Sequence, residues 1–293
     1  MKYHYADNGW TVIVDENIND LSTEDILRVG RLIVSNMVVV FKKQKLTTED
    51  ELRFCWIIGN VQLTEYDRTK HISLVDGILR VTGKKNDAGE PGLFGHTSAL
   101  DWHSNQASSK DRMPLIWLYG LEGTQGSRTS WINMIEACRD LSIEDRMDLR
   151  KKKAYFGYED GKYSTSRFFH NHVNKDNLFP LIMDNAGGHE GLYFPFLQMF
   201  GMENTSQKDF DEIMKNLTAH VTQEKYTYHH DWDDGDVVLS EQWLSIHKRW
   251  AFQDMEKRVL HRIAFDYSNI YGCLLYTSPS PRDQRGSRMP SCA

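Results

Sequence analysis

The chain lacks a long hydrophobic run. Its longest uninterrupted apolar stretches, such as Met37–Phe41, have five residues, whereas a membrane-spanning helix needs about 20. The first residues also lack the apolar segment that marks a signal peptide. We therefore expect a cytoplasmic protein with no membrane partner.

Cysteines are few, and basic residues do not predominate. The four cysteines among 293 residues are too few for a disulfide scaffold and show no Cys-x-x-Cys metal spacing. Lys and Arg number 35 against 41 Asp and Glu, for a formal net charge of −6, so the basic excess of a typical nucleic-acid binder is missing. We expect no nucleic-acid partner. The oligomeric state stays open, a homo-oligomer included.

The last 21 residues, 273–293, differ in composition from the rest. They hold three of the seven prolines and three arginines, and offer little to bury after Tyr276. Such a composition is typical of disorder, and the segment also resembles translated adapter or vector sequence. We expect residues 1–272 to form a single domain and 273–293 to be a disordered, non-native tail. A native basic docking tail is the alternative.

Hydrophobic patterning predicts a mainly β fold with helices on one side. Capping signals at Ser22 and at Thr47 predict that a helix begins after each of them. Two more helices are expected over Trp131–Leu141 and Gln207–His220. Apolar or alternating runs predict strands over Met37–Phe41, Ile72–Val81, Leu100–His103, Leu115–Gly120, Lys153–Tyr158, Tyr226–Trp232, Val237–Leu239 and Val259–Tyr267.

A loop rich in glycine, proline and charge covers residues 84–95, with the sequence KKNDAGEPGLFG. Loops of this length inside a compact domain are usually functional. We predict that it closes over a bound substrate, as long loops beside active sites often do.

Three segments gather residues that can perform chemistry. In the first, His103 and Asn105 stand two residues apart, so on a strand both face the same side and can converge on one point. The second contains Thr129, and the third contains His247 and Arg258. The segments are Leu100–Gln106, Gly126–Met134 and Trp232–Arg262.

The order and spacing of these segments resemble the taurine dioxygenase (TauD/TfdA-like) family of iron(II)- and 2-oxoglutarate-dependent oxygenases. Residues 102–105 are similar to that family's W-H-x-D strand, and residues 126–129 to its G-G-D-T turn. Residues 235–262 are similar to its block of G-D-x-V, histidine and arginine. The resemblance extends over residues 8–268. It implies a double-stranded β-helix (a jelly roll, cupin-like) with one iron at its open end.

The resemblance also implies roles for single residues. His103 and His247 match the imidazole ligands of the metal, and position 105 would complete a facial two-histidine, one-carboxylate triad. Arg258 matches the arginine that binds the distal carboxylate of 2-oxoglutarate, since a guanidinium meets a carboxylate through two parallel hydrogen bonds. Thr129 matches the hydroxyl that donates to the same carboxylate.

The activity implied is hydroxylation of an unactivated carbon in a small molecule. The cofactors are Fe(II) and 2-oxoglutarate, O2 is the co-substrate, and succinate and CO2 are the co-products. Arg262 matches an arginine that reaches an acidic head group of the substrate. Together with Lys84 and Lys85 it indicates an anionic or zwitterionic substrate.

Asn105 departs from the family pattern, which has a carboxylate at this position. A neutral amide oxygen is a poorer ligand for a dication than an anionic carboxylate. Hydroxylation with Asn105 as a weak ligand is the first expectation. Halogenation with chloride bound to iron is the second, and a non-catalytic binding protein on the same fold is the third. Asp101, on the same strand face as His103, is an alternative carboxylate ligand if a bulge brings it to the metal.

Overall fold

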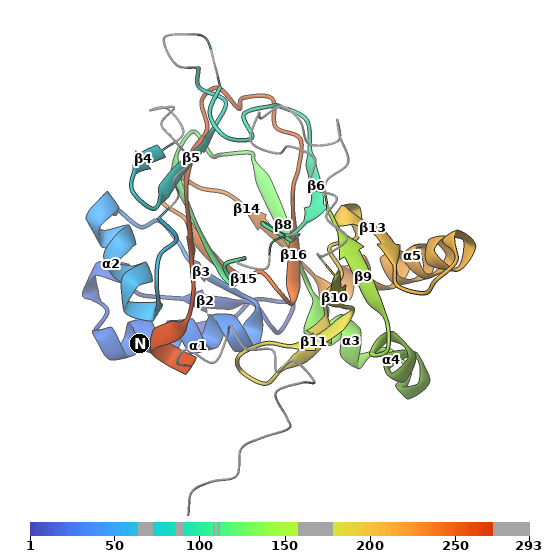
Figure 1. The fold of residues 1–293 in the computed structure, drawn as a ribbon. Coiled ribbons are helices and arrows are strands. Elements are labelled where there is room, and N and C mark those ends of the chain that lie inside the picture. Colours follow the sequence, from blue (N-terminus) through green and yellow to red (C-terminus); the bar gives the residue numbers. More distant parts are fainter. Residues whose placement is uncertain are drawn as a thin grey trace, which may run out of the picture.

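Two facing β-sheets form the centre of the protein. The computed structural model describes residues 1–63, 73–85, 89, 91–107, 109, 112–157 and 178–271. Within them, the larger sheet has eight strands, antiparallel except for one parallel pair, β2 and β3 (Figure 1). Its strands are, in spatial order, β1 (Tyr3–Tyr5), β2 (Val12–Val14), β3 (Val38–Phe41), β15 (Val237–Glu241), β7 (Leu115–Glu122), β17 (Val259–Phe265), β5 (Ile78–Thr82) and β4 (Ser73–Val75).

The smaller sheet supplies much of the candidate site. Its order is β14 (Thr227–Asp231), β8 (Arg128–Asn133), β16 (Ser245–Arg249) and β6 (Leu100–His103). Two minor sheets stand beside it. They consist of β10 (Leu178–Pro180), β9 (Lys153–Phe156) and β13 (Met199–Met202), and of β11 (Ile182–Asp184) with β12 (Glu190–Leu192).

The strands of the larger sheet feed two separate hydrophobic cores. Val38 and Val40 of β3 pack into the core between the two sheets, which also takes Trp131 from β8. Val39 and Phe41 point the other way, into a core under the N-terminal helices. Because successive strand residues face opposite sides, one continuous apolar run can serve both cores. The facing sheets confirm the predicted mainly β jelly roll.

Two capped helices cover the outer face of the larger sheet. They are α1 (Thr23–Asn36) and α2 (Thr48–Ile58), and the short α6 (Ser268–Tyr271) packs against both. The Ser22 side chain accepts a hydrogen bond from the backbone N–H of Asp25. Thr47 and Asp50 form a reciprocal capping box at the start of α2. Both predicted helix starts are therefore confirmed.

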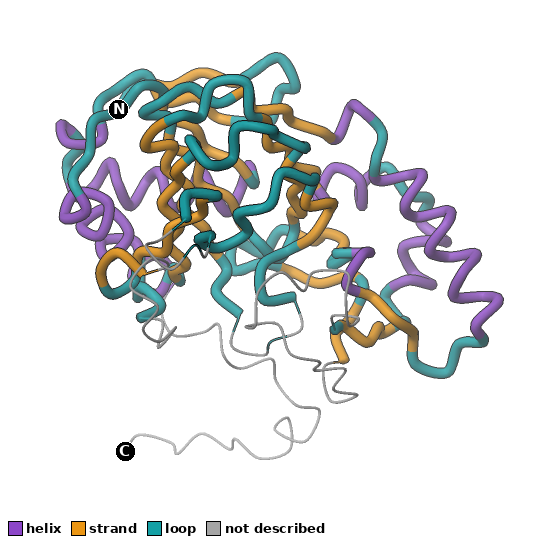
Figure 2. The backbone as a smooth tube through the Cα atoms, turned by 90° about the horizontal axis from the view of Figure 1, so that it is seen from above, coloured by secondary structure: helices purple, strands orange, loops and turns teal. Residues whose placement is uncertain are grey.

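The prediction that helices lie on one side only was wrong. Figure 2 shows helices at both ends of the molecule with the strands between them. The second group is α3 (Met134–Arg139), α4 (Ile143–Leu149) and α5 (Gln207–Val221), of which α5 matches the predicted helix. In this group α3 packs against β12 and β16, and α5 packs against α3 and β13. Residues of α3 and α5 belong to the same hydrophobic cluster as the residues between the two sheets. Short 3-10 helices occur at Ile18–Asp20, Phe196–Gln198 and Glu224–Tyr226.

Two element boundaries differ from the prediction. Trp131 belongs to β8, and the helix expected from there begins only at Met134, after Asn133, whose side chain caps it by accepting from two backbone N–H groups. Residues 131–133 remain extended because β14 and β16 pair with them on both sides. The strand expected over Ile72–Val81 is a hairpin instead. Its turn contains Gly77 at φ +92°, a conformation that favours glycine.

Parts of the sequence predictions fall outside the described residues. This applies to the tail at 273–293 and to positions 86–88 and 90 of the loop 84–95. In the part of the chain that is described, no helix combines the length and the apolar character needed to cross a membrane.

A buried carboxyl group at the end of β15 should make the stability of the fold depend on pH. Glu241 accepts hydrogen bonds from the backbone N–H groups of Trp243 (3.0 Å) and Leu244 (2.6 Å). Burial raises its pKa to about 8, although these bonds and Arg112 oppose the shift. Since the folded chain holds this proton more tightly than the unfolded chain, the group's contribution to stability is lost as the pH rises through 8.

We expect the wild-type free energy of unfolding to fall by about 2 to 3 kcal/mol between pH 6 and pH 9 through this group alone. In Glu241→Gln most of that decrease should disappear, because glutamine does not titrate. Urea unfolding at the two pH values measures the effect. Glu136→Gln, on the surface of α3, is the matched control. An equal pH dependence in Glu241→Gln and wild type would contradict the prediction.

Candidate functional site

One cavity between the two sheets contains all six predicted site residues. The smaller sheet contributes His103, Thr129 and His247, and β17 contributes Arg262. Asn105 follows β6, and Arg258 immediately precedes β17. The full lining is Val81, Phe94, Leu100, His103, Asn105, Leu118, Thr129, His247, Arg249, Arg258, Leu260 and Arg262.

The two histidines face each other across adjacent strands. His103 on β6 and His247 on β16 are direct partners in the antiparallel register. Their ring centroids are 4.2 Å apart, and both side chains are buried. His103 Nδ1 donates to the backbone carbonyl of Asp101 at 2.6 Å, an interaction that fixes the ring and its tautomer. This strand pairing brings together two imidazoles that are far apart in the sequence.

Both imidazoles are neutral at physiological pH. Burial lowers the pKa of His103 to about 4; the hydrogen bond to the Asp101 carbonyl opposes this shift, and the positive charges of Arg249 and Arg262 add to it. Burial, then His103 and Arg262, also hold the pKa of His247 well below its usual value. A neutral imidazole has a lone pair available for a metal. The site therefore presents two nitrogen donors without first losing protons.

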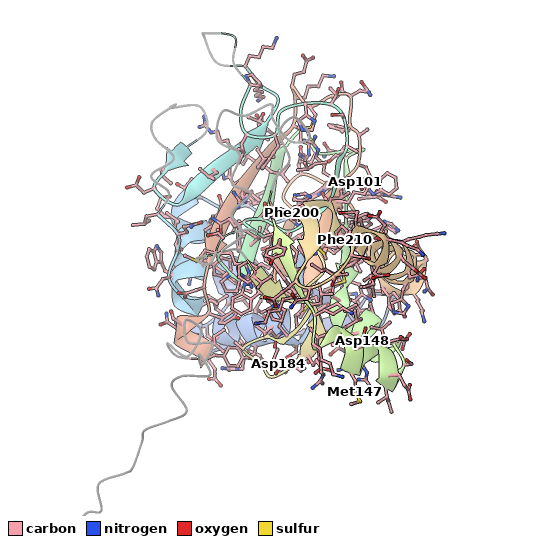
Figure 3. All side chains as sticks on the ribbon, turned by 45° about the vertical axis from the view of Figure 1, so that its right-hand side comes forward. Asp101, Met147, Asp148, Asp184, Phe200 and Phe210 are labelled. Carbon is pink, nitrogen blue, oxygen red and sulfur yellow. The ribbon has the colours of Figure 1, made fainter. Side chains whose placement is uncertain are left out.

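Asn105 and Asp101 have very different positions. Asn105 lies in the cavity, with its Nδ2 3.5 Å from His247 Nε2. Asp101 is half exposed, and its carboxylate pairs with Lys248 at 3.0 Å at the outside of the sheet (Figure 3). Strands β6 and β16 do contain a bulge between His103 and Leu100. Asp101 is nevertheless absent from the cavity lining.

Arg258 is a buried cation without an anionic partner among the described residues. Only 1% of the residue is exposed. Its Nε donates to Ser127 Oγ at 3.2 Å, while its Nη1 is buried without a hydrogen-bond partner. Burial, then the charge of Arg249, lowers its pKa to about 9, which still leaves it charged near neutral pH. A buried charge of this kind strongly favours an anionic ligand.

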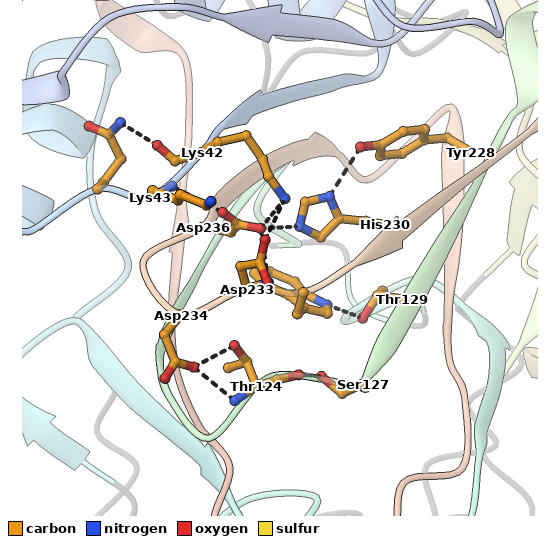
Figure 4. A network of polar contacts seen from close by, with 12 residues as sticks. Lys42, Lys43, Thr124, Ser127, Thr129, Tyr228, His230, Asp233, Asp234 and Asp236 are labelled. Atoms are coloured by element: carbon orange, nitrogen blue, oxygen red, sulfur yellow. Dashed lines mark hydrogen bonds and ion pairs between the residues drawn. The ribbon is translucent and has the colours of Figure 1, made fainter.

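Thr129 lines the same cavity as this guanidinium, and a tryptophan orients its hydroxyl. Trp232 Nε1 donates to Thr129 Oγ1 at 3.0 Å (Figure 4). Because the indole N–H can only donate, the threonine oxygen accepts here, and its own hydrogen is free to point elsewhere. Thr129 is thus prepared to donate a hydrogen bond into the cavity.

A buried aspartate fixes the turn that carries Trp232. Asp236 accepts from the backbone N–H groups of Lys43 and Asp233, each at 3.0 Å, and pairs with the Lys42 side chain (Figure 4). His230 Nε2 lies 3.2 Å from the same carboxylate. Burial opposes ionisation, but these partners lower the pKa of Asp236 to about 2. The sequence signal for this turn was its Gly235-Asp236 pair.

Two further arginines give the cavity a strong positive charge. Arg249 donates to the backbone carbonyls of Phe94, His96 and Ser98 at 2.6–2.8 Å, so it ties the end of the 84–95 loop and the residues after it to β16. Arg262 lies on β17 and lines the cavity. Lys84, in contrast, pairs with the Glu122 carboxylate at the surface. None of the lining residues is an aspartate or glutamate.

Sequence reasoning missed several residues that shape the site. Arg249 had a readable signal, because a position two residues after His247 on a strand faces the same side. Ser127, Gln198 and Gln242 had none, since their contacts join segments that are distant in the sequence.

Comparisons with known proteins agree with the observed fold. The model of the family "Taurine catabolism dioxygenase TauD, TfdA family" matches residues 8–264. The alpha-ketoglutarate-dependent 2,4-dichlorophenoxyacetate dioxygenase of Burkholderia sp. (strain RASC) is 23% identical over 257 residues, which cover 83% of this chain and 86% of that protein. Pentalenolactone F synthase of Streptomyces avermitilis is 25% identical over 274 residues, covering 84% and 86%.

Solved structures share the fold at low sequence identity. AAD-2, crystallised with Mn(II) and N-oxalylglycine, superposes with a TM-score of 0.74 at 17% identity, over 90% of this chain and 96% of that one. A taurine dioxygenase from Burkholderia xenovorans gives a TM-score of 0.68 at 16% identity, over 87% and 85%. Since the family model spans most of the sequence, the chain belongs to the taurine catabolism dioxygenase TauD, TfdA family.

Proposed function

We propose that the protein is an Fe(II)- and 2-oxoglutarate-dependent oxygenase that hydroxylates a small anionic or zwitterionic molecule. Family membership supports the reaction class. The observation that carries the proposal is the buried Arg258 guanidinium, which has no carboxylate partner among the described residues and lies in one cavity with two neutral imidazoles. A diacid that reaches from a metal to this guanidinium satisfies both features.

The residues present fit a metal that takes two imidazole ligands. His103 and His247 would hold it, because their rings are buried, neutral and adjacent. When bound, ferrous iron supplies oxygen activation coupled to the conversion of 2-oxoglutarate into succinate and CO2. Among the described residues, no group of three or more His, Cys, Asp or Glu side chains is arranged to hold a metal. At position 105 an asparagine stands where the family pattern has the third, anionic ligand.

The side chains of the cavity would bind the co-substrate, orient it and neutralise its charge. Arg258 would form charge-assisted hydrogen bonds to the distal carboxylate of 2-oxoglutarate, with Ser127 holding its Nε in place. Thr129 would donate its hydroxyl hydrogen to the same carboxylate, since the Trp232 indole already donates to its oxygen. The apolar side chains of Leu118, Leu260 and their neighbours would exclude water.

The substrate class follows from the positive charge of the cavity lining. Arg249 is engaged by backbone carbonyls there. Arg262 also lines the cavity, close enough to both histidines to lower their pKa values. We assign to Arg262 the binding of an acidic group on the substrate.

A screen for succinate release tests the function and the role of Arg262 together. With ferrous iron, ascorbate and air, succinate formation should increase with some members of a panel of carboxylic, sulfonic and amino acids. Arg262→Ala should lower the kcat/KM for such a substrate about 10-fold or more. Its affinity for 2-oxoglutarate, measured by calorimetry with Mn(II), should change less than about threefold. Equal loss for anionic and uncharged substrates would contradict the assignment of Arg262.

The alternatives make different predictions in the same assay. A non-catalytic binding protein would bind 2-oxoglutarate and release no succinate under any condition. Chlorine transfer finds no support in the relatives named above, and the Asn105 amide fills the position that a chloride ligand requires. Products formed with and without chloride should therefore be identical by mass spectrometry.

A further inference from the structure

The segment that follows His103 is held on two sides by buried glutamines. The backbone N–H of Ser104 donates to Gln198 Oε1 at 2.8 Å, and Gln198 Nε2 donates back to the Ser104 carbonyl at 2.9 Å. The Ser104 hydroxyl donates to the backbone carbonyl of Gln242 at 2.6 Å. All three residues are at most 1% exposed. The backbone at Ser104, which leads into Asn105, is therefore held in place by hydrogen bonds.

Gln242 also fixes which end of the Asn105 amide faces the histidines. The backbone N–H of Asn105 donates to Gln242 Oε1 at 3.3 Å, and since a backbone N–H can only donate, this atom must be the oxygen. The Nδ2 of Asn105 donates to the same oxygen at 3.0 Å. Gln242 Nε2 in turn donates to Ser240 Oγ at 3.0 Å. The side-chain nitrogen of Asn105, and not its oxygen, is therefore turned toward this oxygen.

The same Nδ2 is the Asn105 atom that lies 3.5 Å from His247 Nε2. An amide nitrogen carries two hydrogens and has no lone pair to offer a cation, so in this orientation the side chain cannot be a ligand. The surrounding charge acts in the same direction. Three guanidinium groups and no carboxylate line the cavity, so a dication enters a site that repels it unless an anion accompanies it.

We propose that Gln242 keeps Asn105 from binding the metal, so that two histidines and the diacid alone hold it. The inference rests on the proposed function and refines it at one position, where the sequence had suggested Asn105 as the third ligand. Gln242 is then a positioning residue, and metal and 2-oxoglutarate bind with strong mutual cooperativity. The diacid compensates the positive charge of the arginines, and the dication compensates the negative charge of the diacid. Each ligand therefore tightens the binding of the other, and by the same factor.

Metal binding without turnover tests this. Mn(II) affinity of the full chain is measured by calorimetry and by the loss of the free Mn(II) resonance, with and without 2-oxoglutarate, in the absence of O2. We expect 2-oxoglutarate to tighten Mn(II) binding about 30-fold or more. Asn105→Ala should leave the Mn(II) affinity within about threefold of wild type, because no ligand is removed. Asn105→Asp should tighten binding of Mn(II) alone about 10-fold or more by adding an anionic ligand.

Gln242→Leu provides an independent test of the positioning role. Without the glutamine oxygen, Asn105 can rotate and offer its own oxygen, so Mn(II) alone should bind several times more tightly. The same substitution in the Asn105→Ala background should have no such effect. A merely structural role for Gln242 predicts weaker binding in both backgrounds, which would overturn the assignment. If Gln242→Leu does not fold, the two Asn105 variants decide the question alone.

The possible failures are distinguishable. A 10-fold or greater loss of Mn(II) affinity in Asn105→Ala, with wild type still binding Mn(II) together with 2-oxoglutarate, overturns the inference and leaves the proposed function intact. Failure of wild type to bind Mn(II) even with 2-oxoglutarate overturns the proposed function, and the inference with it.

Discussion

Replacing Arg258 by alanine is expected to raise the dissociation constant of 2-oxoglutarate by about 30- to 1,000-fold, the usual cost of deleting one side of a buried charge pair. The reason is the geometry around the guanidinium, which is buried, held by Ser127 through Nε, and left with an unpartnered Nη1. Arg249, the other buried arginine of the cavity lining, instead donates to the backbone carbonyls of Phe94, His96 and Ser98. Calorimetry with Mn(II) present measures the affinity directly, and the KM for 2-oxoglutarate should change in parallel.

A comparison of variants separates charge from geometry at this position. Arg258→Lys keeps the positive charge but loses the planar pair of donors, so its affinity for 2-oxoglutarate should lie between wild type and Arg258→Ala. Arg139→Ala removes an exposed arginine of α3 that pairs with Glu136 and serves as the control. Unchanged 2-oxoglutarate affinity in Arg258→Ala would count against the whole assignment of the cavity.

The thermal stability of Arg258→Ala without ligand provides a second test, in which we expect a small effect and not a large one. Removing an ordinary buried side chain destabilises a fold by leaving a cavity. Here the substitution also removes an uncompensated buried charge, which costs free energy in the folded state. We therefore expect the thermal midpoint without ligand to fall little or not at all, while the stabilisation by added 2-oxoglutarate disappears.

Replacing either histidine by alanine should remove the metal site. His103 and His247 are the two imidazole donors of the cavity lining in the described structure. His103→Ala and His247→Ala should therefore each weaken Mn(II) binding in the presence of 2-oxoglutarate by about 100-fold or more, and succinate formation should become undetectable. A family member with a carboxylate ligand retains two protein donors after such a change. This chain retains one, so the loss should be more complete.

The control is a histidine outside the cavity. His189 lies at the surface, where its ring contacts Ser35 Oγ, so His189→Ala should bind Mn(II) as wild type does. Circular dichroism confirms that the variants are folded. Retention of wild-type Mn(II) affinity by His103→Ala or by His247→Ala would show that the two rings do not form the metal site.

The site residues could be predicted from the sequence because the chemistry of the site depends on residue types in a fixed order. His103, Thr129, His247, Arg258 and Arg262 were all singled out from such an order, and the structure brings them into one cavity. Positions 103 and 105 both reach the cavity as predicted, although β6 ends at His103 and Asn105 lies in the turn after it. The structural consequence of asparagine at 105 could not be predicted, because it depends on Gln242, a residue far away in the sequence.

The errors in the fold prediction have a common physical cause. Residues 131–133 have an apolar pattern compatible with a helix, and only pairing with β14 and β16 makes them a strand. Asp101 shows the same limitation in the site. Its place on the strand suggested a ligand, but the bulge and the partner Lys248 hold it outside the cavity. Local preferences are overruled where a neighbouring strand supplies the hydrogen bonds.

The position of β17 affects how the protein acquires its activity during synthesis. This strand lies between β7 and β5, both made much earlier; it begins immediately after Arg258 and carries Arg262. During synthesis, the edges of β5 and β7 that pair with β17 therefore stay unpaired until β17 is made and inserts between them. The nascent chain has neither a closed sheet nor a receptor for the diacid before that moment. Assembly of the scaffold and acquisition of ligand binding are thus a single late event.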